Sequence, residues 1–498
     1  MMSGLPNIAD DESMEDEVLV FVRRSLARPL PVGKDFLSIT VPAPLDAAEK
    51  FLRLVPRDRG FLWRSTASLE QLAGGGSAGA LKVRGADRFR VLALAVPELF
   101  ARVESVAYEQ VPPPPVLVGG AAFSAEGKSS GAWEEFEDDE LTLPRWGYRR
   151  RRHLATVTLT VQREELASAG RVDELVGELR SIMREFAEDP PTSLIQRFDS
   201  ESLEVSQMSL DDWWNYIDRI HLAIRSGCYQ KIVAARRAVV ELDNPIEDTS
   251  LMARVYAAYP DCIHYAIRRP RSTFFGATPE TLFRKRGNEL VTHALAGTTR
   301  IKDDPTSDST RDVAALQSSE KDLDEHLYVV KKIRSALEPL ATKVEHPMVP
   351  EARQVRNLIH LQTPIRAELR AETSVFDLLE ALHPTPAVGG FPAREAAQWI
   401  AENEPLDRGW YSGTVGWIDA NGDGEFAVSI RCGVLSPKRA YVFAGAGIVE
   451  ASDPAAEYAE TAAKMWPILR ALGAPQSGLA DAAPPPVSER SLKVSTPL

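Results

Sequence analysis

The chain contains little cysteine: three residues, Cys228, Cys262 and Cys432, among 498. They are too few and too widely spaced for a disulfide framework or a zinc site, which needs ligands in close pairs. Scattered free thiols are typical of a reducing compartment, so we expect a cytoplasmic protein.

Long apolar runs and an excess of positive charge are also missing. No apolar run approaches the roughly 18 residues that a membrane-spanning helix requires. The first residues, MMSGLPNIADDESMEDE, lack the basic and then apolar segments of a signal peptide. The formal net charge of −13 disfavours binding to nucleic acid or to an anionic membrane. We therefore expect neither nucleic acid nor a membrane as a partner.

The length of the chain predicts more than one packing unit. With 498 residues, 44% of them apolar, the chain exceeds the roughly 250 to 300 residues at which a single core usually stops growing. We expect a disordered acidic tail over 1–20, an N-terminal subdomain over 21–200, a second subdomain over 201–472 and a disordered tail over 473–498.

Alternating apolar residues predict several strands. The segments with alternation and β-branched content are 88–96 (RFRVLALAV), 154–161 (LATVTLTV), 426–435 (FAVSIRCGVL) and 440–449 (AYVFAGAGIV). Because these segments do not alternate regularly with helices, they favour an α+β fold with antiparallel sheets.

Two segments show the apolar period of a helix that is buried on one side. In 211–227 the predicted buried stripe is Trp214, Ile217, Ile220 and Ile224, and Gly227 suits the C-terminal end. In 318–337 the predicted buried stripe is Leu323, Leu327, Val330 and Leu337. Both helices keep a polar face for other contacts.

Two helical segments carry acidic pairs at positions i and i+3. Asp322 and Glu325 form one pair, and Glu457 and Glu460 form the other, with Lys464 on the same face. Each face alone is compatible with simple solvation. If the helices pack together, however, two carboxylates about 4 Å apart repel by roughly 4 kcal/mol at an effective dielectric near 20. Such a cluster needs a cation, and an all-oxygen set suits Mg²⁺.

A calcium-binding loop is excluded by one position. The segment DANGDGEFAVSI, 419–430, matches the first half of an EF-hand loop, but its twelfth residue is Ile430 where a bidentate Glu is required. Because the segment lies between two strand-like runs, its Asn-Gly-Asp-Gly sequence predicts a hairpin turn.

Eight blocks in a fixed order resemble the chorismate-utilising enzymes, and within them the isochorismate synthases. The blocks are KIVAARR (231–237), FFGATPETLF (274–283), HALAGTTR (293–300), EKDLDEH (320–326), VRNLIHLQT (355–363), LHPTPAVGGFP (382–392), LDRGWYSGTVGW (406–417) and AGAGIVEASDPAAEYAETAAK (444–464). The first two hundred residues match only loosely. The resemblance implies a large two-subdomain α/β sandwich of the α+β class, with mainly antiparallel sheets inside and helices outside.

The resemblance also implies a reaction and a set of site residues. Chorismate would become isochorismate as water adds at C2 and the C4 hydroxyl leaves, with Lys231 as base and Glu280 as acid. Glu325 and Glu460 would bind Mg²⁺ directly, with Asp322 and Glu457 in support. The implied substrate-binding residues are Gly297, Thr298, His360, Thr363, His383, Arg408, Gly445, Gly447 and Lys464.

These roles place demands on two pKa values. A lysine near 10.4 must have its pKa lowered toward about 7 to 8 to act as a base. A glutamate near 4.3 must have its pKa raised to hold a proton for a leaving hydroxyl. Without the resemblance, Lys231 resembles a surface lysine and Glu280 an exposed turn residue.

Three alternatives follow from the same residues. Anthranilate and aminodeoxychorismate synthases, which use ammonia, resemble this chain less, because they typically carry Gln at the position of Lys231 and many of the latter carry Lys at that of Ala296. No amidotransferase subunit is therefore expected. Salicylate synthase, which goes on to eliminate pyruvate, is the alternative activity, and a non-catalytic Mg²⁺-binding scaffold is a remote one. The pathway that the product serves, whether menaquinone, siderophore or salicylate, does not follow from the sequence.

Overall fold

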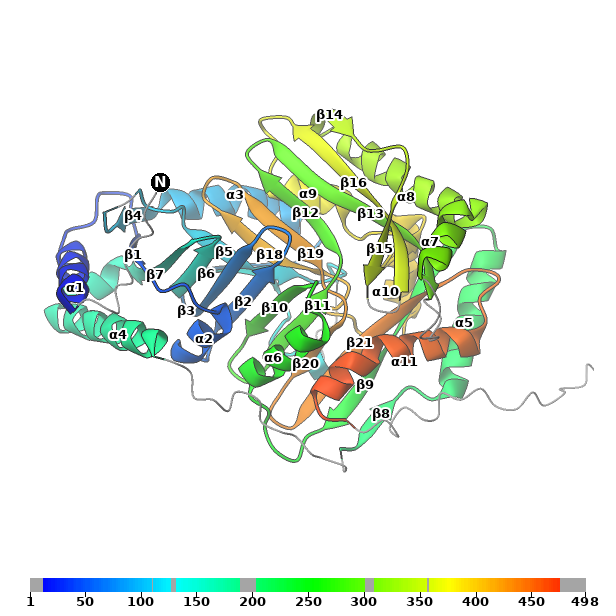
Figure 1. The fold of residues 1–498 in the computed structure, drawn as a ribbon, viewed down its shortest axis with the longest axis horizontal. Coiled ribbons are helices and arrows are strands. Elements are labelled where there is room, and N and C mark those ends of the chain that lie inside the picture. Colours follow the sequence, from blue (N-terminus) through cyan, green and yellow to red (C-terminus); the bar gives the residue numbers. More distant parts are fainter. Residues whose placement is uncertain are drawn as a thin grey trace, which may run out of the picture.

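The computed structural model describes residues 12–109, 111–126, 131–188, 203–300, 309–355 and 358–474. The helices are α1 (Glu12–Leu26), α2 (Ala48–Leu54), α3 (Arg88–Ala101), α4 (Ala169–Ala187), α5 (Leu210–Arg225), α6 (Asp248–Ala258), α7 (Ser309–Ser318), α8 (Glu320–Leu337), α9 (Val375–Leu382), α10 (Ala393–Asn403) and α11 (Pro454–Ala471). Figure 1 shows their arrangement. No helix in these described ranges is long and apolar enough to cross a membrane.

The strands account for most of the interior. They are β1 (Phe36–Pro42), β2 (Gly60–Ser65), β3 (Glu70–Val83), β4 (Val103–Ala107), β5 (Val116–Ala121), β6 (Asp139–Arg151), β7 (Leu154–Gln162), β8 (Val205–Gln207), β9 (Lys231–Glu241), β10 (Ile263–Arg268), β11 (Thr273–Thr278), β12 (Thr281–Arg286), β13 (Glu289–Arg300), β14 (Ala341–Glu345), β15 (Glu351–Val355), β16 (Leu358–Leu369), β17 (Gly390–Phe391), β18 (Thr414–Asp419), β19 (Gly424–Val428), β20 (Cys432–Leu435) and β21 (Arg439–Ile448). The predicted strands at 154–161 and 440–449 are confirmed, and β18 and β19 form the predicted hairpin.

The sheet branches at β6, which pairs with three strands. One edge of β6 pairs with β3 from Asp139 to Arg151. On its other edge, residues 140–142 pair with β5 and residues 146–151 pair with β7. Pro144 lies between these two stretches and has no N–H to donate to a ladder. One series of strands leaves β6 through β3 and a second leaves it through β5, whereas β7 continues to β1.

The first series runs β6-β3-β2-β10-β11-β20-β21-β9, and the second runs β6-β5-β18-β19-β12-β13-β16. Every pairing in both series is antiparallel, so the predicted α+β fold with antiparallel sheets inside is confirmed. Strands on opposite sides of the predicted boundary near residue 200 pair directly, as β2 does with β10 and β5 with β18. The boundary itself stays a prediction.

Large aromatic side chains fill the space between the two series. Trp133 stacks on Phe443 of β21 with ring centroids 5.2 Å apart, and it meets Phe274 of β11 edge-on at 5.4 Å. Trp417 of β18 belongs to the same buried cluster. Because both series contribute rings, the cluster fixes how they face each other.

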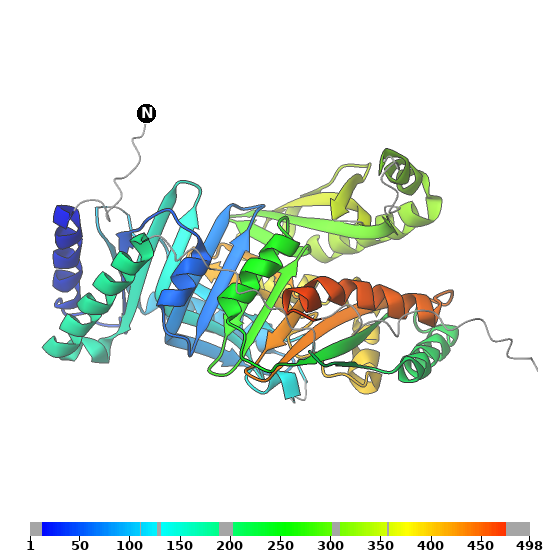
Figure 2. The ribbon, with the colours of Figure 1, turned by 60° about the horizontal axis from the view of Figure 1, so that its bottom comes forward.

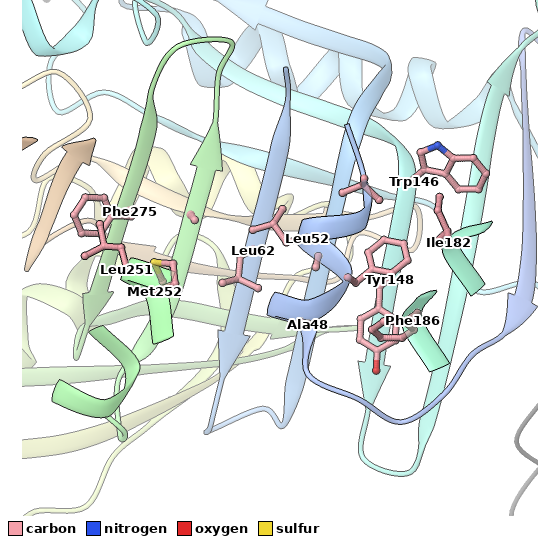
Figure 3. Packing of buried hydrophobic residues seen from close by; sticks show 14 of the residues in the cluster. Ala48, Leu52, Leu62, Trp146, Tyr148, Ile182, Phe186, Leu251, Met252 and Phe275 are labelled. Atoms are coloured by element: carbon pink, nitrogen blue, oxygen red, sulfur yellow. The ribbon is translucent and has the colours of Figure 1, made fainter. Parts of the chain in front are cut away.

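Helices cover the outer faces of both series. In Figure 2, α1, α2, α4, α6 and α11 lie along one side of the first series, and Figure 3 shows side chains of α2, α4 and α6 against its strands. Leu52 of α2, Phe186 of α4 and Met252 of α6 share one buried cluster with Tyr148 of β6. Helices α3, α5, α8, α9 and α10 contribute side chains to a second buried cluster.

The predicted strand at 88–96 is wrong, because these residues form the start of α3. Phe89, Leu92 and Val96 are buried at helical spacing, whereas Val91 and Leu94 are exposed. The segment has apolar residues on both sides of the helix, so its sequence also satisfies a two-residue alternation. The exposed apolar residues therefore concealed the helical period.

Two predicted buried stripes need correction by one residue each. On α5, Trp213 is fully buried and donates from Nε1 to the Pro454 carbonyl at 2.9 Å, whereas Trp214 is 39% exposed. On α8, Leu327 is 41% exposed and His326 is buried instead. In both helices the buried position is taken by a residue with a hydrogen-bonding side chain. Trp213 bonds the Pro454 carbonyl and His326 bonds the Thr363 hydroxyl, so neither is left without a partner.

Part of the predicted disordered tail over 1–20 is wrong. Helix α1 begins at Glu12 and buries Val18, Leu19, Val22 and Leu26 against the protein, so a short apolar stripe offsets its acidic composition. Residues 1–11, and residues 475–498 of the predicted C-terminal tail, lie outside the described residues.

The predicted strand 426–435 is two strands, β19 and β20, separated at Ser429–Arg431.

Gly409 should tolerate no side chain. Its φ is +47°, and a Cβ there would lie 2.3 Å from Cδ2 of Trp133 in the aromatic cluster. We expect Gly409→Ala to lower the free energy of unfolding by about 3 kcal/mol, from backbone strain together with overpacking. Gly85→Ala is the matched control, since Gly85 has φ +94° and no atom within 4 Å of the added Cβ. Urea unfolding of both variants measures the difference, and equal losses would contradict the role of the Trp133 contact.

Candidate active site

Two strands of the first series build the surface on which Lys231 lies. In the β9–β21 ladder, Val233 pairs with Gly447 and Ala235 pairs with Gly445. A Cβ on Gly447 would lie 2.4 Å from Cε of Lys231, and a Cβ on Gly445 would lie 2.8 Å from the Tyr411 hydroxyl. The Lys231 side chain therefore crosses β21 over Gly447. We call Gly445 and Gly447 the glycine floor.

Glu280 lies in the turn between β11 and β12, close to this lysine. Its carboxylate accepts a hydrogen bond from Oγ1 of Thr385 at 3.1 Å. Burial raises the pKa of Glu280 to about 7, against the opposing effects of the Thr385 hydrogen bond and the Lys231 charge. The two predicted catalytic groups thus lie within electrostatic reach of each other, and the pKa of Glu280 is raised as its predicted role demands.

Helix α11 brings the second acidic pair beside the glycine floor. It lies along β21 (Figure 1), with Glu457 and Glu460 on one face as predicted. Nζ of Lys464 lies 2.7 Å from Oε1 of Glu460 and donates to the Gly445 carbonyl at 2.8 Å. Burial raises the pKa of Glu457, the Ser452 hydroxyl opposes the rise, and the charge of Glu460 adds to it. Negative charge therefore accumulates at this end of β21.

The first acidic pair begins α8, which packs on a bulge in β13. Gly297 has φ +75° at this bulge, and a Cβ there would lie 3.4 Å from Cβ of Asp322. The Ser319 hydroxyl caps this helix by accepting a hydrogen bond from the Asp322 N–H at 3.3 Å, and it donates to the Asp322 carboxylate. The side chains of Glu325 and Thr298 lie outside the described residues. Asp322 and Gly297 are therefore brought together as the motifs suggested.

His360 connects the two halves of this region. On β16 it pairs with Thr298, one residue beyond the bulge. Burial lowers the pKa of His360 to about 4, the charges of Arg431 and Lys464 lower it further, and Glu460 opposes them. His360 on β16 of the second series therefore lies within electrostatic reach of Glu460 and Lys464 on α11, the helix that packs on β21 of the first series. The two acidic helices approach the same region from opposite sides.

The donor chemistry of this region fits Mg²⁺. All four predicted ligands are carboxylates, the donor type that Mg²⁺ prefers. Burial is the main cause of the raised pKa of Glu457, and the charge of Glu460 adds to it, so a cation between the two carboxylates would oppose that second contribution. Among the described side chains no group of three or more His, Cys, Asp or Glu residues is gathered closely enough to hold a metal ion, and Glu325 lies outside them.

Two predicted substrate ligands are held within the protein. His383 is buried, its Nε2 lies 2.9 Å from the Ser412 carbonyl, and burial lowers its pKa to about 4. Thr363 is buried with its hydroxyl 2.7 Å from Nε2 of His326. The other ring nitrogen of His326 lies 3.2 Å from the Ala296 carbonyl, so this histidine ties α8 to β13 and β16. The sequence analysis missed His326, although it stands within the EKDLDEH block.

Arg408 does not point to a free carboxylate site. Its guanidinium is 3% exposed and bonds the Glu404 carboxylate in a bidentate pair. Arg431 is a better placed cation, because its charge acts on His360 and its residue lies in the gap between β19 and β20 with φ +49°. Arg431 was not among the predicted site residues, because residues 426–435 were predicted as one continuous strand. The break at Ser429–Arg431 that sets Arg431 apart is visible only in the structure.

Comparisons with known proteins agree with this geometry. The sequence model of a family described as chorismate binding enzyme matches residues 33–473. The salicylate biosynthesis isochorismate synthase of Pseudomonas aeruginosa is 36% identical over 390 residues, covering 75% of this chain and 79% of the relative. Isochorismate synthase MenF of Bacillus subtilis is 35% identical over 370 residues, covering 72% and 75%. The structure of the menaquinone-specific isochorismate synthase MenF of Escherichia coli superposes with a TM-score of 0.75 at 25% identity, covering 92% of this chain and 99% of that one.

The raised pKa of Glu280 predicts a pH-dependent stability difference. A carboxyl whose pKa is about 7 when folded and near 4.5 when unfolded favours folding below pH 4.5, and this contribution is lost as the pH rises through 7. Glu280→Gln stays neutral at every pH. We therefore expect its Tm relative to wild type to rise between pH 5 and pH 8.

Thermal unfolding at four pH values across this range measures the effect. Glu372→Gln, at an exposed position, is the control and should give an offset that does not change with pH. A constant offset for Glu280→Gln as well would show that Glu280 ionises as an ordinary carboxyl.

Proposed function

Because this chain belongs to the chorismate-binding enzymes, and within them to the isochorismate synthases, we propose that it converts chorismate to isochorismate by the lysine and glutamate chemistry of its own site. The observation that carries this proposal is that the charge of Lys231 acts on Glu280, whose pKa burial raises to about 7. A protonated carboxyl beside a lysine provides the acid and the base that the reaction needs.

The roles of the two groups follow from the bonds that change. Water adds at C2 of the ring, and Lys231 in its neutral form takes a proton from that water. The C4 hydroxyl leaves as water, and Glu280 in its protonated form supplies the proton. The charge of Lys231 lowers the pKa of Glu280, so the loss of that charge would strengthen the tendency of Glu280 to keep its proton.

Glu325 and Glu460 would hold Mg²⁺, with Asp322 and Glu457 in support. When bound, the ion neutralises the carboxylates of the protein and of the substrate. Helix α11 positions Glu460, and Lys464 shares its face. The fit rests on the carboxylate donor set and on the raised pKa of Glu457.

The substrate is a dicarboxylate, so cations and backbone N–H groups should hold it. Lys464 and Arg431 are two of the three cations whose charges act on His360, and the third is Arg353. The glycine floor and the Gly297–Thr298 bulge allow a ring to approach the backbone closely. In this proposal His383, Thr363 and Arg408 do not bind the substrate, and their hydrogen bonds to other protein groups hold the surrounding segments in place. No amidotransferase subunit, nucleic acid or membrane takes part, and the enzyme works in the cytoplasm.

Salicylate synthase is the second candidate. A relative 36% identical to this chain is named a salicylate biosynthesis isochorismate synthase, and the same lysine serves both activities in the family. The distinction lies in whether pyruvate is released after isochorismate forms.

Incubation of the purified protein with chorismate and Mg²⁺, without ammonia, tests the reaction. We expect a mixture of chorismate and isochorismate on chromatography, and its loss on addition of EDTA. Salicylate with pyruvate would favour the second candidate instead, and unchanged chorismate would refute both.

Lys231→Ala should lower kcat by about 10²- to 10⁴-fold, the usual contribution of a general base. Lys438→Ala, at an exposed position beyond β20, is the control and should leave kcat unchanged. Steady-state rates of the two variants provide the comparison, and comparable rates would remove Lys231 from the mechanism.

The activity should also decline at high pH. Because Glu280 must carry a proton, kcat/KM of the free enzyme should fall above an apparent pKa near 7, set by the buried carboxyl. A pH–rate profile without this descending limb would exclude Glu280 as the acid.

A further inference from the structure

We propose that the buried ion pair of Glu404 and Arg408 is a positioning device that sets Lys231 against Glu280; this inference rests on the proposed function. Nε of Arg408 lies 2.5 Å from Oε1 of Glu404, and its terminal nitrogen lies 2.8 Å from Oε2. The side chains are 3% and 1% exposed. Neither group of the pair reaches the reacting atoms.

Both side chains bond the backbone of β9. Oε2 of Glu404 accepts a hydrogen bond from the Ala235 N–H at 3.0 Å, and Arg408 donates to the Val233 carbonyl at 2.8 Å. On this edge β17 pairs only with Lys231 and Ile232, while β8 pairs from Ala238 onward. The ion pair therefore takes the place of a neighbouring strand just beyond Lys231.

The same pair also holds the segment that contacts Glu280. Arg408 donates to the Val388 carbonyl at 2.7 Å. The N–H of Val388 in turn donates to the Thr385 carbonyl at 3.1 Å. Oγ1 of Thr385 donates to the Glu280 carboxylate at 3.1 Å. One guanidinium thus ties the strand of the base to the loop that orients the acid.

A planar, charged fork suits this task because it fixes several directions at once. The Glu404 carboxylate also accepts a hydrogen bond from the Tyr216 hydroxyl of α5 at 2.9 Å, which leaves it little freedom to rotate. A shift of about 1 Å between reacting groups can lower a rate by about 10²-fold. The pair is therefore placed to affect turnover more than substrate affinity.

The test compares this pair with a matched buried pair elsewhere. Arg268 and Asp248 also form a bidentate pair, at 2.6 and 2.7 Å, and their other partners are Leu52 and Thr273. The site variants are Glu404→Gln and Arg408→Lys, and the control variants are Asp248→Asn and Arg268→Lys. Each is assayed for Tm, kcat, KM and the pH dependence of kcat/KM, well below its own Tm.

The expected result separates positioning from stability. At a similar loss of Tm, the site variants should lose about 10²-fold in kcat with KM changed less than about threefold. Their descending pH limb should also move, because Thr385 no longer orients Glu280. The control variants should keep kcat within about twofold and keep the limb in place. A fall in kcat that follows Tm equally in both sets would overturn the proposal.

Hydrogen exchange gives a readout that does not depend on catalysis. In the site variants, loss of protection should concentrate in 230–236 and 385–391, while the control variants keep both segments protected. If the wild type fails to convert chorismate, the proposed function falls and exchange alone decides the positioning role. Exchange that is unchanged in these two segments would overturn it, whatever the activity.

Discussion

The branching of the sheet at β6 is the constraint on which the site depends. β6 is the strand that the two series share: the first series leaves it through β3 on one edge, and the second leaves it through β5 on the other edge, which β7 shares beyond Pro144. The first series carries Lys231 and the glycine floor, while the second carries Gly297 and His360. The aromatic cluster around Trp133 then fixes the angle between them. A site assembled from both series needs a rigid joint, and close-packed rings provide it.

Burial acts on charged groups in this protein in two opposite ways. It raises the pKa of Glu280 and lowers that of His383, so both groups favour the neutral form. Glu404 and Arg408 instead remain an ion pair, because each supplies the other with a bidentate partner. In the proposed function the neutral carboxyl would transfer a proton, whereas the ion pair would hold the geometry. One desolvated region thus supports both kinds of group.

Local pattern predicted much of the fold and part of the site. Alternation predicted β7 and β21 because each buries one face, and helical spacing predicted the acidic stripe of α11. The same reasoning misassigned α3, whose exposed Val91 and Leu94 imitate alternation. Arg431 was not predicted because it lies within a segment that was assigned as one strand. Its positive φ, at the break in that segment, cannot be recognised from the composition. Glu404 is four residues from Arg408, but the other two partners, the carbonyls of Val388 and of Val233 on β9, lie 20 and 175 residues away, so no local pattern could predict those contacts.

The close contact between Lys231 and Gly447 should couple the evolution of these two positions. A Cβ at position 447 would occupy space that the lysine methylenes now fill, so a larger residue there would require the Lys231 side chain to move. A lineage in which residue 231 became small would be released from the requirement for glycine. Across many descendants of one ancestor, the residues at positions 231 and 447 should therefore change together.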